Sequence, residues 1–143
     1  MRQNRGYTLI EVMTVIAIIG ISTSIVIPNV IGWLPKYRLR AGAEEIQSTL
    51  QLARLGAIKQ NTNATVNFSA IHHTFVAAIA GKTIKRGNMP SGIMIDSITF
   101  PSSKVQFDSR GLANTWIGDI VVKNSQGTTK TISVNIVGKS KIQ

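Results

Sequence analysis

The chain has 143 residues, about the length of one domain, which does not favour a two-domain enzyme. Hydrophobic residues make up 43% and charged residues 15%, so the chain can bury a core and is not a disordered tail. A net charge of +10 favours nucleic acid, phospholipid head groups or acidic protein surfaces as partners, without choosing among them. The lack of cysteine excludes disulfides, a thiolate nucleophile and cysteine metal sites.

The first element is an apolar run of membrane length. Residues 7–34 carry one charged side chain, Glu11, and Arg2 and Arg5 precede them. About 20 helical residues cross a bilayer core of about 30 Å, and Leu9 to Ile27 are apolar enough to do so. A secretory signal peptide is the alternative, but its apolar core spans about 7 to 15 residues and has no use for a carboxylate at its start. We therefore predict a membrane helix that contains a functional Glu11.

The helix is predicted to continue to about Gln60 with a different surface. Apolar residues recur at steps of three and four, which is the stripe of an amphipathic helix that packs on a sheet. The stripe consists of Leu39, Ala43, Ile46, Leu50, Ala53 and Ala57. Pro28 and Pro35 should bend or loosen the junction between the two halves.

After Gln60 the pattern changes to short apolar runs separated by turn residues, which predicts strands. The expected strands are 65–68, 74–79, 93–98, 104–107, 118–122 and 129–137. The last two, joined through Asn124 to Gly127, indicate a hairpin. The fold class is therefore α+β, with a long N-terminal helix, partly transmembrane, packed against a C-terminal antiparallel β-sheet domain.

The residues Gly6-Tyr7-Thr8-Leu9-Ile10-Glu11-Val12-Met13 follow a basic leader and begin an apolar helix. This segment resembles the class III signal of type IV pilins and pseudopilins, with Tyr7 in place of the usual Phe. The resemblance implies that a prepilin peptidase cuts after Gly6 and methylates the new amino terminus of Tyr7. It also implies that the Glu11 carboxylate pairs with the terminal amine of a neighbouring subunit during filament assembly.

The resemblance also implies a domain organisation and a location. Residues 1–6 are then the leader, residues 7–34 the transmembrane and filament-core helix, and residues 35–143 a pilin-like periplasmic or extracellular domain, with an amphipathic helix over about 36–60 and a sheet over about 64–143. The expected location is the bacterial inner membrane, crossed once, with the C-terminal domain in the periplasm. Charge alone does not settle this topology, because Lys36, Arg38 and Arg40 balance the basic leader.

Further motifs narrow the resemblance to the GspH/FimT branch of pseudopilins. Arg54, Ala57 and Asn61 stand at the spacing of its A-R-x-x-A-I-x-x-N-x-x-V pattern, and Val66 lies two positions beyond the place of its last residue. Three later segments match its L-P-x-G-V segment, its F-x-x-x-G segment and its closing glycine-basic strand: 89–93, 107–111 and 138–141. Members of this branch are minor subunits of a type IV pilus or of a type II secretion pseudopilus, and they are not catalysts. The implied partners are other pilin or pseudopilin subunits, the prepilin peptidase and the inner membrane.

An alternative function is uptake of double-stranded DNA in natural transformation. Some FimT-like members resemble DNA receptors that bind through a C-terminal G-R-x-R motif, and here Lys139 and Lys141 stand where that motif has Arg. Lys is a point charge without the bidentate fork of Arg, which weakens the match. The candidate DNA-binding residues are Lys139, Lys141, Lys82, Lys85 and Arg86, in a region 35–143 with 14 basic and 5 acidic residues, 14 − 5 = +9.

An enzyme is the third class, and the sequence offers little for it. His72 and His73 are adjacent, so on a strand they would face opposite sides and could not hold one metal ion together. Gly127-Thr128-Thr129-Lys130-Thr131 lacks the glycine that precedes the lysine of a phosphate-binding loop. We expect no catalytic residue, no metal site and no cofactor.

Overall fold

The structure is a computed structural model that describes residues 7–113 and 117–143, without the side chains of 25–31. The chain divides into two compact units, of which the first ends at Leu34 and the second begins at Pro35. Helix α1 (Leu9–Lys59) contributes residues 9–34 to the first unit and residues 35–59 to the second. Neither Pro28 nor Pro35 ends the helix. In the described part of the chain, no helix has a stretch both long and apolar enough to cross a membrane.

Both ends of α1 are capped. Thr8 precedes the helix, and its hydroxyl oxygen accepts a hydrogen bond from the Glu11 amide at 3.3 Å, which is the N-cap arrangement. At the other end Asn61 adopts a positive φ of 47°. The amides of Asn61 and Thr62 donate to the carbonyls of Ile58 and Ala57, at 3.2 and 3.0 Å. This pattern is a Schellman cap with asparagine in the left-handed position, and it ends the helix where the sequence predicts.

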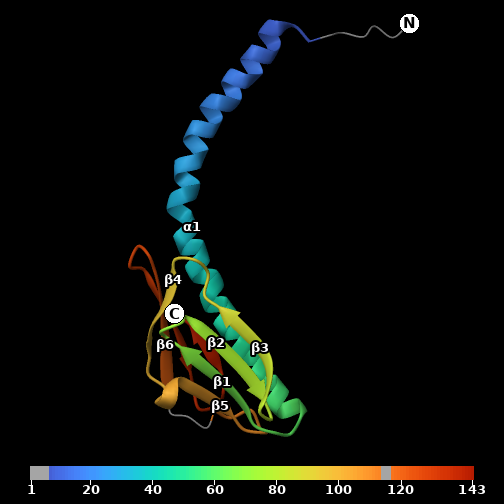
Figure 1. Ribbon diagram of the computed structural model, residues 1–143, viewed down its shortest axis with the longest axis vertical. Helices are drawn as coiled ribbons and strands as arrows, with labels where there is room; N and C mark the ends of the chain where they lie inside the picture. Colours follow the sequence, from blue (N-terminus) through green and yellow to red (C-terminus); the bar gives the residue numbers. More distant parts are fainter. Residues whose placement is uncertain (1–6, 114–116) are drawn as a thin grey trace, which may run out of the picture. The chain divides into compact units, whose positions relative to one another are not determined.

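Two antiparallel sheets follow the helix (Figure 1). The first has the strand order β3-β2-β1-β5 and the second β4-β6-β7-β8. The strands are β1 (Ala64–Ser69), β2 (Thr74–Ile79), β3 (Lys82–Asn88), β4 (Ile93–Ile98), β5 (Lys104–Phe107), β6 (Gly118–Asn124), β7 (Thr129–Val134) and β8 (Ser140–Ile142), with a 3-10 turn η1 (Pro101–Ser103) before β5.

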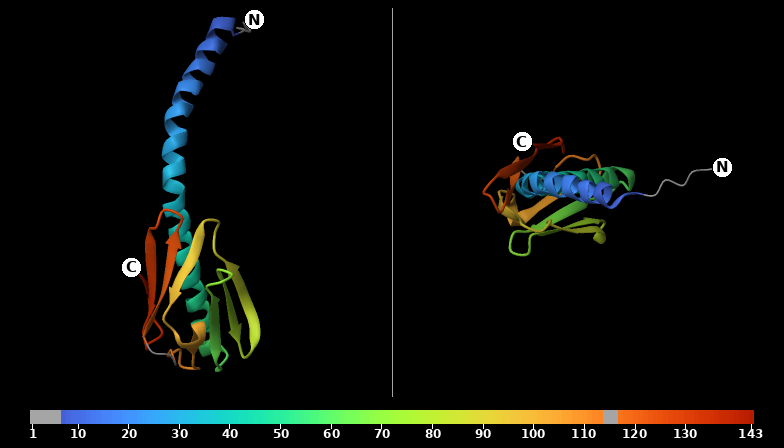
Figure 2. Two further views of the ribbon diagram at one scale, coloured as in Figure 1. Left: turned by 60° about the vertical axis from the view of Figure 1, so that its left-hand side comes forward. Right: turned by 90° about the horizontal axis from the view of Figure 1, so that it is seen from above.

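One core joins residues 35–59 of α1 to both sheets, which curve around this part of the helix (Figure 2). The predicted apolar stripe is confirmed, because its six residues from Leu39 to Ala57 are each at most 2% exposed. The sheets contribute alternate residues, such as Val66 and Phe75 from the first and Ile120 and Ile132 from the second. At about 25 cal/mol per Å² of apolar surface removed from water, this burial is the main contribution to the stability of the second unit.

The predicted strands are confirmed except at the end of the chain. The expected strand 129–137 is wrong in its last part, because β7 ends at Val134 and residues 135–138 form a turn in which the Gly138 amide donates to the Asn135 carbonyl at 2.8 Å. The predicted hairpin is confirmed, with Val122 opposite Lys130 and Ile120 opposite Ile132. None of the expected strands covers β3. The closing basic segment is expected in a strand only through the family resemblance, and β8 is that strand.

Candidate functional site

The N-terminal end of α1 presents a carboxylate among apolar side chains. Glu11 is the third residue of the helix, where the positive end of the helix dipole favours a negative charge. Together with Tyr7, Val12, Val15 and Ile16 it lines a shallow hollow of about 380 Å³. Gly6, the predicted cleavage site, lies outside the described residues. The end of the helix thus combines a charge-bearing group with a surface that an apolar partner could cover.

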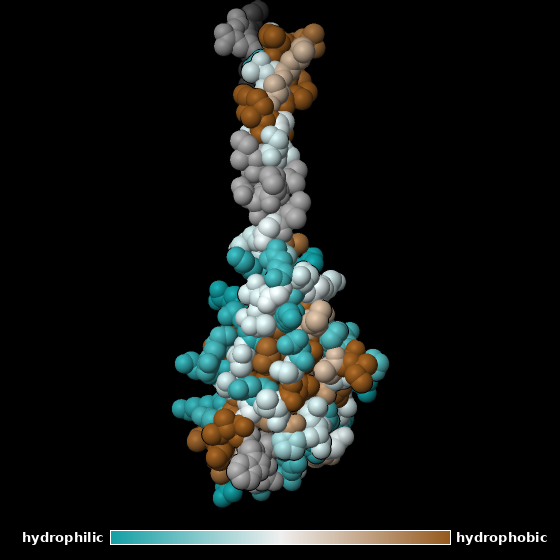
Figure 3. All heavy atoms as spheres, turned by 90° about the vertical axis from the view of Figure 1, so that its left-hand side faces the viewer, coloured by the Kyte–Doolittle hydropathy of each residue, from teal (hydrophilic) through white to brown (hydrophobic). Residues whose placement is uncertain are grey.

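The side chains of residues 9–21 are exposed although most of them are apolar (Figure 3). Those with large apolar side chains in this segment are Leu9, Ile10, Val12, Met13, Val15, Ile16, Ile18, Ile19 and Ile21. An exposed apolar surface of this extent on a single helix marks an interaction surface for lipid or for other protein chains.

The second unit holds most of the motif residues, and Arg54 explains two of the motifs. The Arg54 guanidinium Nε donates a hydrogen bond to the Gly111 carbonyl oxygen at 2.9 Å. Gly111 ends the predicted F-x-x-x-G segment, 57 residues further along the chain. The arginine of the helix motif therefore holds the loop after β5 against the helix, which is a structural role.

Gly138, which begins the closing basic segment, lies directly over this contact. It has φ of +74°, a region that side chains rarely adopt. A Cβ at this position would stand 2.2 Å from the Gly111 carbonyl oxygen and 2.8 Å from Arg54 Nε. Only glycine fits here without displacing the Arg54–Gly111 hydrogen bond, so the glycine of the closing segment is needed for packing.

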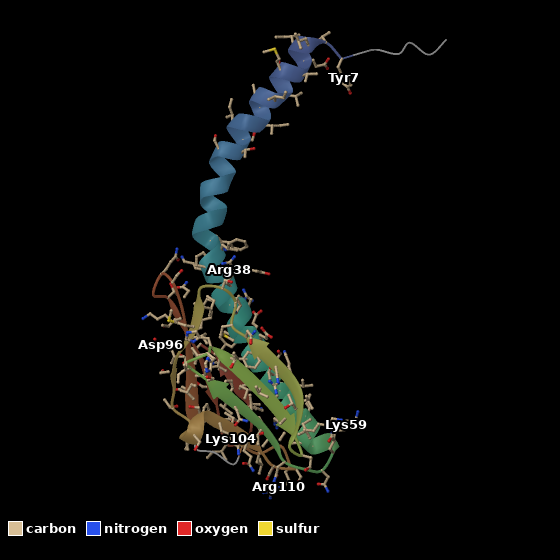
Figure 4. The ribbon with its side chains drawn as sticks, in the orientation of Figure 1. Tyr7, Arg38, Lys59, Asp96, Lys104 and Arg110 are labelled. Carbon is tan, nitrogen blue, oxygen red and sulfur yellow. The ribbon has the colours of Figure 1, made fainter. Side chains whose placement is uncertain are left out.

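Two further side chains of α1 bind backbone carbonyls in the same way. Arg38 Nη1 donates to the Ser91 carbonyl at 3.3 Å, and Gln47 Nε2 donates to the Ser140 carbonyl at 3.0 Å. Arg38 and Lys59 lie near opposite ends of the second unit, so these contacts follow the helix along its length (Figure 4). Arg38, Gln47 and Arg54 are called the three helix anchors below.

The loop that carries Gly111 is held by a carboxylate. Asp108 Oδ1 accepts hydrogen bonds from the amides of Leu112 and Arg110, each at 2.9 Å, and Oδ2 pairs with the Arg110 guanidinium at 2.9 Å. The Leu112 amide first, and Arg110 after it, lower the pKa of the Asp108 carboxyl below its usual value. The charged carboxylate is therefore the form that holds this loop and presents the Gly111 carbonyl to Arg54.

The structure does not bring the five candidate DNA-binding residues together. Lys139 and Lys141 are both exposed, one just before β8 and one within it. The other three lie on β3, an edge strand of the other sheet on the opposite flank of the second unit (Figure 2). Lys85 faces the helix and pairs with Glu45 at 3.7 Å, whereas Arg86 lies on the other face of β3, opposite Val76. These five residues thus form two separate groups.

The two histidines occupy the β1–β2 turn. His73 Nδ1 accepts a hydrogen bond from the Ile95 amide at 3.2 Å, which links this turn to β4. Across residues 7–113 and 117–143, no three side chains of the types that bind metal ions gather at one place. His73 is thus a structural contact between the two sheets.

Comparisons with known protein families agree with this arrangement. The family model described as the prokaryotic N-terminal methylation motif matches residues 1–27. A second family model, described as type II transport protein GspH, matches residues 42–138, which is more than half of the chain. The type IV major pilin PilA of Myxococcus xanthus is 47% identical over 49 residues, covering 34% of this chain. That match spans only 20% of the PilA protein.

Solved structures show the same fold. The type IV minor pilin FimU of Pseudomonas aeruginosa matches with a TM-score of 0.60 at 13% identity, over 76% of this chain and 90% of that chain. The minor pseudopilin EpsH of the Vibrio cholerae type II secretion system matches with a TM-score of 0.62 at 12% identity, over 75% of this chain and 94% of that chain. These matches confirm the predicted fold class of a helix packed on an antiparallel sheet domain.

Proposed function

Because this chain belongs to the family of the type II transport protein GspH, we propose that it matures at its N-terminus and assembles through the first unit. It is a minor pilin or pseudopilin of a type IV pilus or a type II secretion system. In the proposed sequence of events a prepilin peptidase cuts after Gly6, the new amine of Tyr7 is methylated, and Glu11 then selects the position of the subunit in the filament. The partners are the peptidase and other pilin subunits.

The position of Glu11 is the observation that carries the proposal. Its carboxylate stands at the start of a helical segment, residues 9–21, whose side chains are exposed and mostly apolar. A charge in an apolar bundle costs several kcal/mol unless an opposite charge compensates it. The terminal ammonium group of a neighbouring subunit would do so only at one stagger of the two helices. Attraction and desolvation together would then reject a subunit that enters out of register.

We further propose that the chain resides in the bacterial inner membrane before assembly, with the second unit in the periplasm. The apolar sequence from Leu9 to Ile27 supports this location, since its length is close to the thickness of the bilayer core. The finding that no helix of the described residues is able to cross a membrane does not include the side chains of residues 25–31. The basic leader with Arg2 and Arg5 would stay on the cytoplasmic side, where the peptidase acts. The same apolar surface would serve first toward lipid and then toward neighbouring helices.

Maturation can be tested by mass spectrometry of the N-terminal peptide. We expect the chain to begin at Tyr7 with one methyl group, and Gly6→Val to remain uncleaved because a branched side chain replaces the residue at the cut. Arg5→Lys is the matched control, since it keeps the charge of the leader, and it should mature like the unchanged chain. Normal cleavage of Gly6→Val would contradict the assignment of the processing site.

Binding of double-stranded DNA is the second candidate function. It is supported by Lys139 and Lys141, which are both exposed and stand at alternate positions, so their side chains can meet successive phosphates. Among the described residues neither lysine has a salt bridge. The β3 cations would add little to the same contact, because they lie on another sheet and Lys85 is paired with Glu45.

The DNA function can be tested with the purified full-length chain in detergent across a salt series. If DNA uptake is its role, binding should be micromolar, should weaken steeply with salt, and should fall at least about tenfold in a Lys139→Ala, Lys141→Ala double variant. Lys82→Ala with Arg86→Ala removes the same charge from β3 and should change the affinity much less. Equal losses in the two double variants would indicate non-specific attraction to a basic domain.

A further inference from the structure

A hollow beside the Arg54 anchor is not used by the proposed maturation and assembly. It has a volume of about 420 Å³ and is lined by Gln51, Arg54 and Leu55 from α1 and by residues 138–140. The two cations in its wall are Arg54 and Lys139. All of its lining residues belong to the second unit.

The cations of this hollow are available to a ligand. Arg54 uses only Nε, on the Gly111 carbonyl, and no described residue accepts a hydrogen bond from its Nη atoms. The backbone of Lys139 is fixed, because its amide donates to Asn135 Oδ1 at 2.8 Å, while its side chain is exposed. The buried Ser140 hydroxyl, also in the wall, has no hydrogen-bond partner among the described residues. Cationic donors whose hydrogen atoms are not taken by an acceptor of the same chain are an arrangement that can bind an anion.

No carboxylate of the second unit supplies that anion within residues 35–113 and 117–143. Of its five acidic residues, Glu44 pairs with Arg40, Glu45 with Lys85 and Asp108 with Arg110. Asp96 and Asp119 line neither this hollow nor its rim. An anion that binds Arg54 and Lys139 would therefore come from another molecule.

Exposed apolar side chains stand next in sequence to residues that line the hollow, and they favour one kind of ligand over another. Leu52, Leu55 and Ile58 follow one another at steps of three on α1 and are 46%, 62% and 43% exposed. Val137, beside Gly138, is also exposed. A phosphate group brings no apolar surface of its own to cover these side chains, whereas a protein segment with a carboxylate between aliphatic residues covers both features.

We propose that this hollow docks an acidic side chain, flanked by aliphatic residues, of a neighbouring pilin subunit different from this chain. A second copy is disfavoured, because the net charge of +9 on residues 35–143 makes two copies repel each other. The inference rests on the proposed function, since it takes the neighbouring subunit of the assembly as the partner. It adds the site on this chain and the chemistry of the residue that enters it.

The experiment uses a photo-crosslinking residue, p-benzoylphenylalanine, in the full-length chain in cells that assemble the complete system. It replaces Leu55 in the hollow or, as the matched control, Ile71, an apolar residue that is 87% exposed in the β1–β2 turn. We expect an adduct from position 55 only, with a different pilin subunit, at a residue within a few positions of an Asp or Glu. Lys139→Glu should reduce this adduct about tenfold or more through like-charge repulsion, and Lys139→Arg should keep it.

The inference is wrong if the adduct at position 55 is no stronger than at position 71, or if it forms with DNA, lipid or a second copy of this chain. It is also wrong if Lys139→Glu leaves the adduct unchanged. Thermal unfolding of the Lys139→Glu chain, expected to match the unchanged chain, shows that a lost adduct is not a folding defect.

Processing of the N-terminus and incorporation into the assembly are measured in the same cells. A chain that is incorporated without the adduct contradicts only the docking site, whereas a chain that is never incorporated contradicts the proposed function as well.

Discussion

Replacing Glu11 by Gln or Ala should leave a subunit that is processed and membrane-bound but enters filaments at least about tenfold less often. The neighbouring terminal ammonium would lose its counter-charge inside an apolar bundle, which costs several kcal/mol, and each 1.4 kcal/mol is a factor of ten. Gln is the sharper variant, because it keeps the side-chain length and tolerates the first turn of a helix. Immunoblotting of isolated filaments against the membrane fraction measures the ratio.

The matched control is Glu44→Gln, which removes the same charge from an exposed part of α1. Glu44 pairs with Arg40 at 2.7 Å on the surface of the second unit, where an ion pair contributes little. This variant should be incorporated like the unchanged chain. Normal incorporation of Glu11→Gln would remove the role of the charge, and it would leave Glu11 as a residue that only favours the start of the helix.

The largest expected loss of stability comes from Gly138→Ala. The added methyl group meets the Gly111 carbonyl oxygen and the Arg54 guanidinium, so the hydrogen bond between them must lengthen or break. The left-handed backbone of Gly138 costs a further 1 to 2 kcal/mol, roughly, for any side chain. We expect the free energy of unfolding to fall by about 3 kcal/mol, and Tm to fall on the order of 10 °C. Thermal unfolding followed by circular dichroism measures both quantities.

Gly127→Ala separates the two causes of that loss. Gly127 has a similar φ of +82°, but a Cβ there would meet no atom within 4 Å. This variant should therefore lose only the backbone part, about 1 kcal/mol. Equal losses in the two variants would mean that the closing segment can move away from Arg54 and that the contact contributes nothing.

The sequence predicts the elements that bury an apolar face and misses those that do not. The stripe on α1 and strands such as β2 show their period directly, because alternate residues from Phe75 to Ile79 are buried. In β3 the only buried residue is Gly87, so no apolar alternation marks it. Ile136 and Val137 extend the apolar pattern of β7, but they lie exposed in a turn, which is why the expected strand is too long.

The candidate site likewise has features that the sequence predicts and features that it does not. Glu11 is visible in the sequence, since a charge stands out in an apolar run. The partner of Arg54 is not visible, because it is a backbone carbonyl 57 residues away and no residue type identifies it. The sequence also does not show that the basic residues of β3 and those at β8 lie on different sheets, because a positive charge does not indicate which sheet a residue joins.

The three helix anchors have a consequence for how such chains diverge during evolution. Arg38, Gln47 and Arg54 bind carbonyl groups of Ser91, Ser140 and Gly111, and every amino acid carries a carbonyl group. Substitutions in the anchored loops therefore leave the acceptors in place, and selection falls on the donors and on glycines such as Gly138 that admit them. Loop side chains are free to drift toward new partners while the helix and sheets keep their arrangement.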